Sequence, residues 1–149
     1  VTHEQFADAV TVIFNMMGFT PGLRQRPSGL MLVNLRNGIM EALGDVPMKD
    51  TEVPNPQWKG INSLWHNAVS YDGRYAGGDD FDGNIWLIDR KTRKQTLLST
   101  GHYMAPDHQH PSFSPDGSRV LIQSGMLTGG ARLSLIVMPS DPGLTRARN

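Results

Sequence analysis

Two segments of the chain repeat one pattern of residues at a separation of 44 positions. The first begins at His66 and reads HNAVSYDGRYAGGD, and the second begins at His110 and reads HPSFSPDGSRVLIQS. In both, an Asp-Gly pair is expected to form a tight turn between two strands, because Gly tolerates the positive φ that such a turn needs. A weaker third copy begins at His3. A repeat of about 40–50 residues made of consecutive antiparallel strands is typical of the blades of a β-propeller.

Short apolar or alternating runs between turn signals support an all-β fold. The chain has 16 glycines and 10 prolines, and no convincing amphipathic helix competes with the strands. The stretch EQFADAV favours at most one short helical turn, and the stretch from Gly44 to Gly60, with its prolines, is predicted to be a long loop. The predicted strands span residues 11–18, 29–36, 64–70, 74–79, 84–90, 95–100, 110–114, 119–125 and 133–140.

Three repeats are too few for a complete ring. We divide the chain into approximate blades at 1–60, 61–105 and 106–149, all within one propeller domain. Closed propellers have about four to eight blades. We therefore expect a partial ring whose other blades come from the rest of the protein or from another chain. Each blade should be an antiparallel four-stranded sheet that packs face to face on its neighbour, and no helix should exceed about two turns.

Charge and cysteine content exclude several classes of function. Fourteen basic residues balance 14 acidic ones, which argues against a nucleic acid or an anionic membrane as the main partner. No apolar run approaches the ~18 residues that a membrane span needs. The absence of Cys excludes disulfides, thiolate metal sites and Cys nucleophiles. No signal-like segment follows Val1, so we expect a cytoplasmic protein, with the periplasm as the alternative.

The histidines of the repeats are the candidate metal ligands. His66 and His110 occupy the same position in successive repeats, and equivalent positions on the innermost strands of neighbouring blades converge towards the channel. His108 precedes His110 by two residues, which places both side chains on one face of a strand. Neutral imidazole is a common metal ligand, and three with an open position suit catalysis. Metal–nitrogen bonds of about 2.0–2.1 Å predict ring nitrogens within roughly 3–4 Å of one another.

Simpler roles remain open for single residues. A repeated His at the start of a strand can bond the backbone of the neighbouring blade, and this is the alternative for His66 or His110 taken alone. His102 follows a strand and is expected to support the site or to be exposed, rather than to bind an ion. Asp79 and Asp80 are expected to be turn residues, with contact to a ligand as the alternative.

The same segments resemble the oligogalacturonate lyase family of polysaccharide lyases. DHQHPSFSPDGSRVLIQS, WHNAVSYDGRYAGGD and NIWLIDR are similar to the C-terminal blades of these seven-bladed propellers, which hold a manganese-type ion at the channel. The family's His-x-His pair matches His108 and His110, and its preceding blade opens on a His that matches His66. A His-Glu pair one blade earlier matches His3 and Glu4. The resemblance covers most of residues 1–140.

Two positions depart from the family pattern. Asn67 follows His66 where the family has Phe. Ala105 stands three residues before the His-x-His pair, where the family has a Gln ligand. The resemblance therefore requires Gln109, Asp107 or water to take the place of that Gln.

The resemblance implies a metal-dependent lyase that cleaves 4-linked, oligogalacturonate-like uronic-acid oligosaccharides by β-elimination. The cofactor is a divalent ion, Mn²⁺ by resemblance, with Zn²⁺ or Ca²⁺ as alternatives. Binding of the C6 carboxylate to the ion would make the C5 proton easier to remove. A base must lie within hydrogen-bond reach of C5. His3 is the candidate in this chain unless it is itself a fourth metal ligand, and an Arg or Lys of another blade is the alternative.

Two other classes of protein would use the same fold. A non-catalytic TolB-type propeller that binds protein partners predicts no metal, with the histidines bonded to backbone. A propeller that covers the active site of a prolyl-oligopeptidase-type hydrolase predicts a catalytic domain elsewhere in the protein. Bound metal distinguishes the lyase from both.

Overall fold

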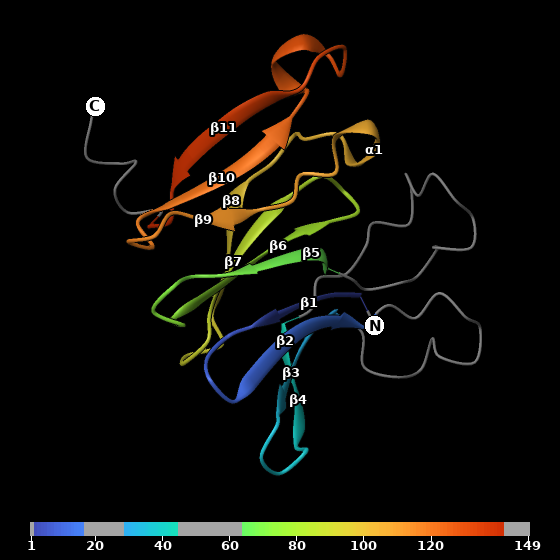
Figure 1. Ribbon diagram of the computed structural model, residues 1–149. Helices are drawn as coiled ribbons and strands as arrows, with labels where there is room; N and C mark the ends of the chain where they lie inside the picture. Colours follow the sequence, from blue (N-terminus) through green and yellow to red (C-terminus); the bar gives the residue numbers. More distant parts are fainter. Residues whose placement is uncertain (1, 17–28, 45–63, 142–149) are drawn as a thin grey trace, which may run out of the picture.

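The computed structural model describes residues 2–16, 29–44 and 64–141, and the statements below concern those residues. They form three antiparallel sheets that follow one another along the chain (Figure 1). The described helical segments are α1 (Met104–Asp107) and a single 3₁₀ turn (Met126–Thr128). The expectation of an all-β fold with only short helices is confirmed. No helix in these ranges is long and apolar enough to cross a membrane.

Within each sheet, strands that are adjacent in sequence are also adjacent in space. Such up-and-down pairing is the connectivity of a propeller blade. The third sheet has three described strands, where four were expected. The first sheet contains β1 (Thr2–Phe6), β2 (Thr11–Met16), β3 (Gly29–Asn34) and β4 (Met40–Gly44). The second contains β5 (Leu64–Val69), β6 (Tyr75–Asp80), β7 (Ile85–Asp89) and β8 (Gln95–Ser99). The third contains β9 (Ser112–Phe113), β10 (Arg119–Ser124) and β11 (Ser134–Pro139).

Two segments of the first sheet differ from the sequence-based expectation. β1 is a strand where a helical turn was considered, because its residues pair with β2. β4 was not predicted, since Met-Glu-Ala-Leu-Gly has little of the branched or aromatic character that marks strands, and it forms by pairing with β3. The predicted loop over 44–60 and the boundary between the first two blades lie almost entirely outside the described residues.

Apolar side chains fill the space between neighbouring sheets, as expected for blades that pack face to face. Full burial of a Val, Leu or Ile side chain contributes about 1.5–3 kcal/mol, so these two layers account for much of the stability of the stack. The layer between the first and second sheets contains Ala7, Ile13, Leu30, Leu32, Leu43, Leu64, Val69, Ala76 and Ile88. The layer between the second and third contains Ile85, Val120 and Ile122, with Leu98, Phe113, Ile136 and Met138 at its margin.

The first strands of the three sheets lie next to one another. β5 contacts β1 on one side and β9 on the other. Because each repeat begins with a His at or just before its first strand, this arrangement brings residues that are far apart in sequence to one end of the stack.

Candidate functional site

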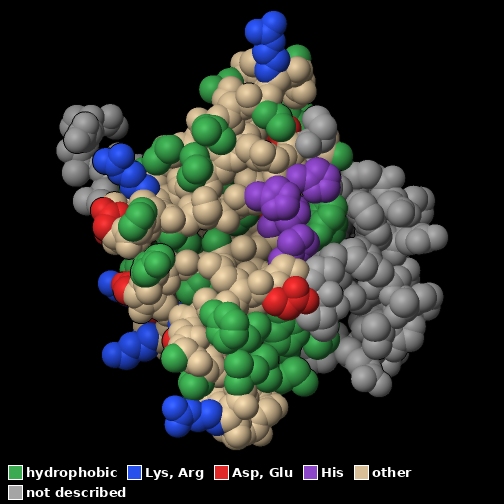
Figure 2. Space-filling model, viewed as in Figure 1, with side chains coloured by type: hydrophobic (Ala, Val, Ile, Leu, Met, Phe, Trp, Pro, Cys, Tyr) green, Lys and Arg blue, Asp and Glu red, His purple; other side chains and the backbone are tan. Residues whose placement is uncertain are grey.

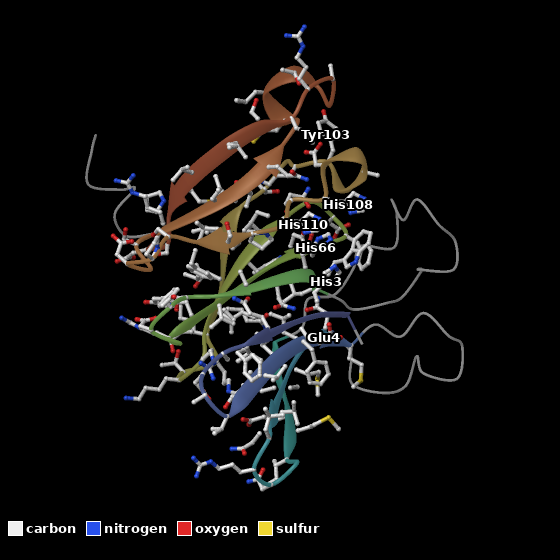
Figure 3. All side chains as sticks on the ribbon, in the orientation of Figure 1. His3, Glu4, His66, Tyr103, His108 and His110 are labelled. Carbon is white, nitrogen blue, oxygen red and sulfur yellow. The ribbon has the colours of Figure 1, made fainter. Side chains whose placement is uncertain are left out.

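Four histidines meet at the end of the sheets where β1 and β5 begin (Figure 3). His3 comes from the first sheet, His66 from the second, and His108 and His110 from the segment that leads into the third. The ring centroid of His66 lies 3.8 Å from that of His110, 4.6 Å from that of His3 and 5.6 Å from that of His108. In the space-filling view, histidine side chains form one patch on the surface (Figure 2).

Three of these side chains can bind a common ion. His66, His108 and His110 each offer one ring nitrogen, and the three nitrogens lie within 4.8 Å of one another. The limit expected from the sequence was about 3–4 Å, so the rings would have to draw closer around an ion. Rotation of the exposed His110 side chain can supply that movement, whereas His66 is buried. The donor set is nitrogen only, which suits Zn²⁺, Fe²⁺ and similar ions and leaves positions for water or substrate oxygens.

β-Bulges direct the first two histidines. Between Thr2 and Gln5, β1 carries one residue more than its partner β2, and β5 has the same irregularity between Leu64 and Asn67. A bulge leaves the extra residue unpaired and turns its side chain away from the regular alternation. His3 and His66 therefore both lie within the bulge of the first strand of their sheet, but one position apart: His3 directly follows the paired residue Thr2, and His66 directly precedes the paired residue Asn67.

His108 and His110 do not lie on a strand. β9 begins only at Ser112, and both histidines adopt left-handed backbone conformations, with φ of 44° and 45°. The expectation that they share one strand face was therefore wrong, although their rings do converge. His3 is also left-handed, with φ of 57°. Such a conformation costs a residue other than Gly of order 1–3 kcal/mol, and strain of this kind concentrates at functional sites.

Asp79 orients the buried imidazole of His66. Its carboxylate accepts a hydrogen bond from His66 Nδ1 at 2.7 Å and another from the His66 backbone N–H at 2.7 Å. With the proton held on Nδ1, Nε2 keeps a free lone pair for an ion, as in carboxylate–histidine–metal arrangements. Asp79 was expected to be a turn residue, but it is a buried residue of β6. Two adjacent acidic residues at the end of a Gly-Gly strand were the available signal, because a buried carboxylate needs a partner.

The indole of Trp65 packs against two of the site histidines. Its indole stacks on the rings of His66 and Phe81, with centroids 4.9 Å apart in both pairs, and lies edge-on to His108 at 4.9 Å. Such packing restricts the rotamers of His66 and His108.

Partial burial lowers the pKa of two imidazoles of the cluster, which favours their neutral form. Desolvation, and then the neighbouring His66 ring, lower the pKa of His3 below its ordinary value. The same two causes lower the pKa of His110. Neutral imidazole is the form that binds metals and accepts protons. In addition, His3 Nδ1 is buried and has no hydrogen-bond partner among the described residues.

The residues considered as substitutes for the missing Gln ligand have other partners. Asp107 Oδ2 accepts hydrogen bonds from Ser124 Oγ and from the backbone N–H of Gly125. The Gln109 amide donates to the carbonyl of Tyr103 at 2.8 Å. Both side chains are fully buried. Asp107 is not part of the metal-binding group among the described residues. The second side-chain oxygens, Asp107 Oδ1 and Gln109 Oε1, are buried and have no hydrogen-bond partner there, so Gln109 and water both stay open for that ligand position.

His102 is also buried, and its two ring nitrogens are engaged away from the site. Nε2 is 2.8 Å from Ser99 Oγ, and Nδ1 is 2.8 Å from Ser124 Oγ. Burial lowers its pKa. Since Ser124 also donates to Asp107, His102 belongs to the hydrogen-bond network that supports the segment before β9.

Asn67, the second departure from the family pattern, links the first two sheets beside the site. Its side-chain amide donates to the carbonyl of His3 and to Asn15 Oδ1. Asn15 in turn donates to the carbonyls of Leu64 and Trp65. These bonds hold the two bulges in a fixed relation, which a Phe at position 67 would not do.

Comparisons with known proteins identify the fold. No protein-family model and no curated protein sequence matches the chain. TolB from Agrobacterium tumefaciens matches with a TM-score of 0.56 and 16% identity over 89% of this chain and 39% of that one. The tricorn protease matches at 0.55 and 13% identity, over 90% and 11% of the two chains. An oligogalacturonate lyase in complex with manganese matches at 0.48 and 17% identity, over 96% and 49%.

These likenesses establish a β-propeller fold and no more. The identities are too low to carry an activity from any of the three proteins, and a TM-score of 0.48 supports no argument about the lyase. The chain spans less than half of the length of each of these proteins, so it corresponds to part of a propeller.

Proposed function

We propose that the protein is a metal-dependent polysaccharide lyase whose ion is bound by His66, His108 and His110. The observation that carries the proposal is the convergence of these three imidazoles, two of them on strained left-handed backbone, beside a carboxylate that fixes the tautomer of the third. A His with a purely structural role would need neither a strained left-handed backbone nor a ring nitrogen close to those of two other histidines. Mn²⁺ is proposed from the sequence resemblance, although an all-nitrogen donor set is also well suited to Zn²⁺.

The substrate class follows from the sequence resemblance, and the residues present suit its chemistry. In a 4-linked uronic acid, β-elimination moves the C5 proton to a base, forms the C4=C5 double bond and breaks the C4–O bond, and the leaving oxygen then takes up a proton. A bound divalent ion would offset the charge of the C6 carboxylate as negative charge develops beside it. His3 is proposed as the base, since its neutral ring lies next to His66 and its Nδ1 lacks a partner among the described residues.

Two measurements test this proposal. Metal analysis of the protein purified without chelator should find about one divalent ion per chain that contains the three histidines. Addition of oligogalacturonate should produce the ultraviolet absorbance of the conjugated C4=C5 bond, and EDTA should abolish it. Protein free of metal that nevertheless binds a protein partner would favour the non-catalytic TolB-type module instead.

The remaining blades are proposed to come from the rest of the protein or from a second chain. Both outer sheets of the stack expose large apolar side chains on the face opposite the buried layers. Leu135 and Val137 of β11 are 75% and 57% exposed, and Phe6 and Met40 of the first sheet are 65% and 57% exposed. Further blades should cover these apolar side chains. The mass of the intact protein would show whether those blades belong to the same chain or to a second one.

A further inference from the structure

The segment that carries His108 and His110 has almost no regular secondary structure of its own. It lies between α1 and the two-residue strand β9, and two of its residues are left-handed. A segment of this kind does not hold two ligands in place by itself, because the left-handed conformation is unfavourable for side chains other than Gly. The bonds that hold it must come from elsewhere.

One residue of β10 bonds three successive carbonyl groups of this segment. The side-chain amide of Gln123 donates to the carbonyls of Asp107 at 2.6 Å and His108 at 2.8 Å. The backbone N–H of Gln123 donates to the carbonyl of Gln109 at 3.1 Å. The side chain of Gln123 therefore fixes the peptide groups on both sides of His108, and its backbone N–H fixes the next one, which joins Gln109 to His110.

Neighbouring bonds secure the start of the same segment. Asp107 Oδ2 accepts from the Gly125 N–H at 2.7 Å and from Ser124 Oγ at 3.0 Å, and both donors follow Gln123 directly in sequence. Space for this contact depends on the absence of a side chain at Gly125, since a Cβ there would lie 2.9 Å from Asp107 Oδ1. Three consecutive residues, 123–125, thus bond the ligand segment and its start.

We infer that Gln123 is a positioning residue for metal binding: its side-chain amide holds the two peptide groups that flank the left-handed His108, and through them the segment that brings His108 and His110 to His66. This inference rests on the proposed metal site, and it adds a residue that touches neither ion nor substrate. The side chain of Gln123 donates to two carbonyl groups and to no ligand ring. It acts through the backbone of the segment, before any ion is present.

Gln123→Met tests the inference, because Met keeps the length of the side chain and removes both donors. Gln95→Met, at an exposed position of β8, is the matched control. With Zn²⁺ or Co²⁺ alone as the probe, Gln123→Met should bind about 10–100-fold more weakly than the parent protein. The visible Co²⁺ spectrum should also change, since it reports ligand geometry. Gln95→Met should match the parent protein in both readouts.

A metal-free readout separates this inference from the proposed function. In EDTA, the amides of residues 108–110 should exchange hydrogen faster in Gln123→Met than in the control, while those of β5 do not change. Gln123→Lys, which returns an N–H donor at this position, should recover part of the protection and of the affinity. This variant serves if Gln123→Met does not fold.

The possible outcomes lead to different conclusions. If the parent protein binds no Zn²⁺ or Co²⁺, the proposed metal site fails, while the exchange rates still show whether Gln123 holds the segment. If the parent protein binds and Gln123→Met has the same affinity, the same Co²⁺ spectrum and the same exchange rates, the inference is wrong. An equal loss in Gln123→Lys and Gln123→Met would also overturn it, because the donor would then not be the cause.

Discussion

Replacement of Asp79 by Asn tests how the site selects the metal-binding nitrogen of His66. Both oxygens of the Asp79 carboxylate accept bonds from His66, one from Nδ1 and one from the backbone N–H, each at 2.7 Å. In Asp79→Asn, the amide oxygen can still accept from the backbone, and the NH₂ group then faces Nδ1. His66 is driven to place its proton on Nε2, the nitrogen that an ion requires.

The size of the effect follows from this change of tautomer. Loss of the group that orients a metal-binding His typically weakens metal affinity by about 10–100-fold. At about 1.4 kcal/mol per tenfold change, this corresponds to roughly 1.4–2.8 kcal/mol of binding free energy. Stability of the metal-free protein should fall as well, because a hydrogen bond to a charged group contributes about 1.5–3 kcal/mol and Asp79 is fully buried.

Calorimetric titration with Zn²⁺ and chemical denaturation in EDTA measure the two effects separately. The adjacent Asp80 provides a matched control. It is also buried, but it accepts bonds from Asn84 and from the indole of Trp86 instead of from a site His. Asp80→Asn should therefore lower stability and leave metal affinity unchanged. Wild-type Zn²⁺ affinity in Asp79→Asn would refute the reasoning, as would an equal loss of affinity in both variants.

Three further predictions concern the site and its support. The proposed lyase function predicts that, in the protein with all its blades, His66→Ala and His110→Ala each lose the bound metal and uronate cleavage while the fold remains, whereas His3→Ala loses cleavage and keeps its metal. Metal content and elimination rate measured on each variant decide this, and cleavage by metal-free His110→Ala would contradict it. His102→Ala should reduce turnover far less than any of these. Gly83→Ala should destabilise the protein by at least about 1–3 kcal/mol. Gly83 has φ of +76°, and a Cβ there would lie 1.8 Å from the His102 carbonyl oxygen. An unchanged melting temperature would show that the turn can relax. In EDTA, the melting temperature should fall as the pH drops from 7 towards 5. Burial lowers the pKa of His102, so the unfolded chain binds more protons than the folded one once the pH is below about 6.5. The slope of melting temperature against pH should decrease in His102→Gln, and an unaltered slope would assign the effect to other groups.

Sequence periodicity predicted the fold and the identity of the converging histidines better than it predicted how they converge. The 44-residue spacing of His66 and His110 is a property of the repeat, and repeats that stack must bring equivalent positions together. The conformation of the ligand segment has no such signal. Left-handed φ values usually occur at Gly or Asn, but here they occur at His108 and His110. The hydrogen bonds that stabilise this segment come from Gln123, more than ten residues away in sequence.

The hydrogen-bond partners of the buried polar residues at the site could not be predicted from the sequence either. Asp79 pairs with His66 across a strand–strand register that contains a bulge, and alternation along β5 does not predict which residue faces which across such an irregularity. Asn67 appeared only as a departure from the resemblance. Its contact with the carbonyl of His3 arises from the neighbouring sheet, which no local pattern describes.

Because the candidate ligands belong to separate repeats, an ion bound there would cross-link two neighbouring sheets. His66 stands on the second sheet, and His108 and His110 lead into the third. An ion at 100 times its dissociation constant stabilises the bound state by about 2.7 kcal/mol. That free energy would oppose separation of these two sheets, at the end opposite to the Asp72-Gly73 and Asp116-Gly117 turns that follow β5 and β9. No single blade can therefore be excised with the site intact, and the smallest unit able to hold the ion is a pair of adjacent blades.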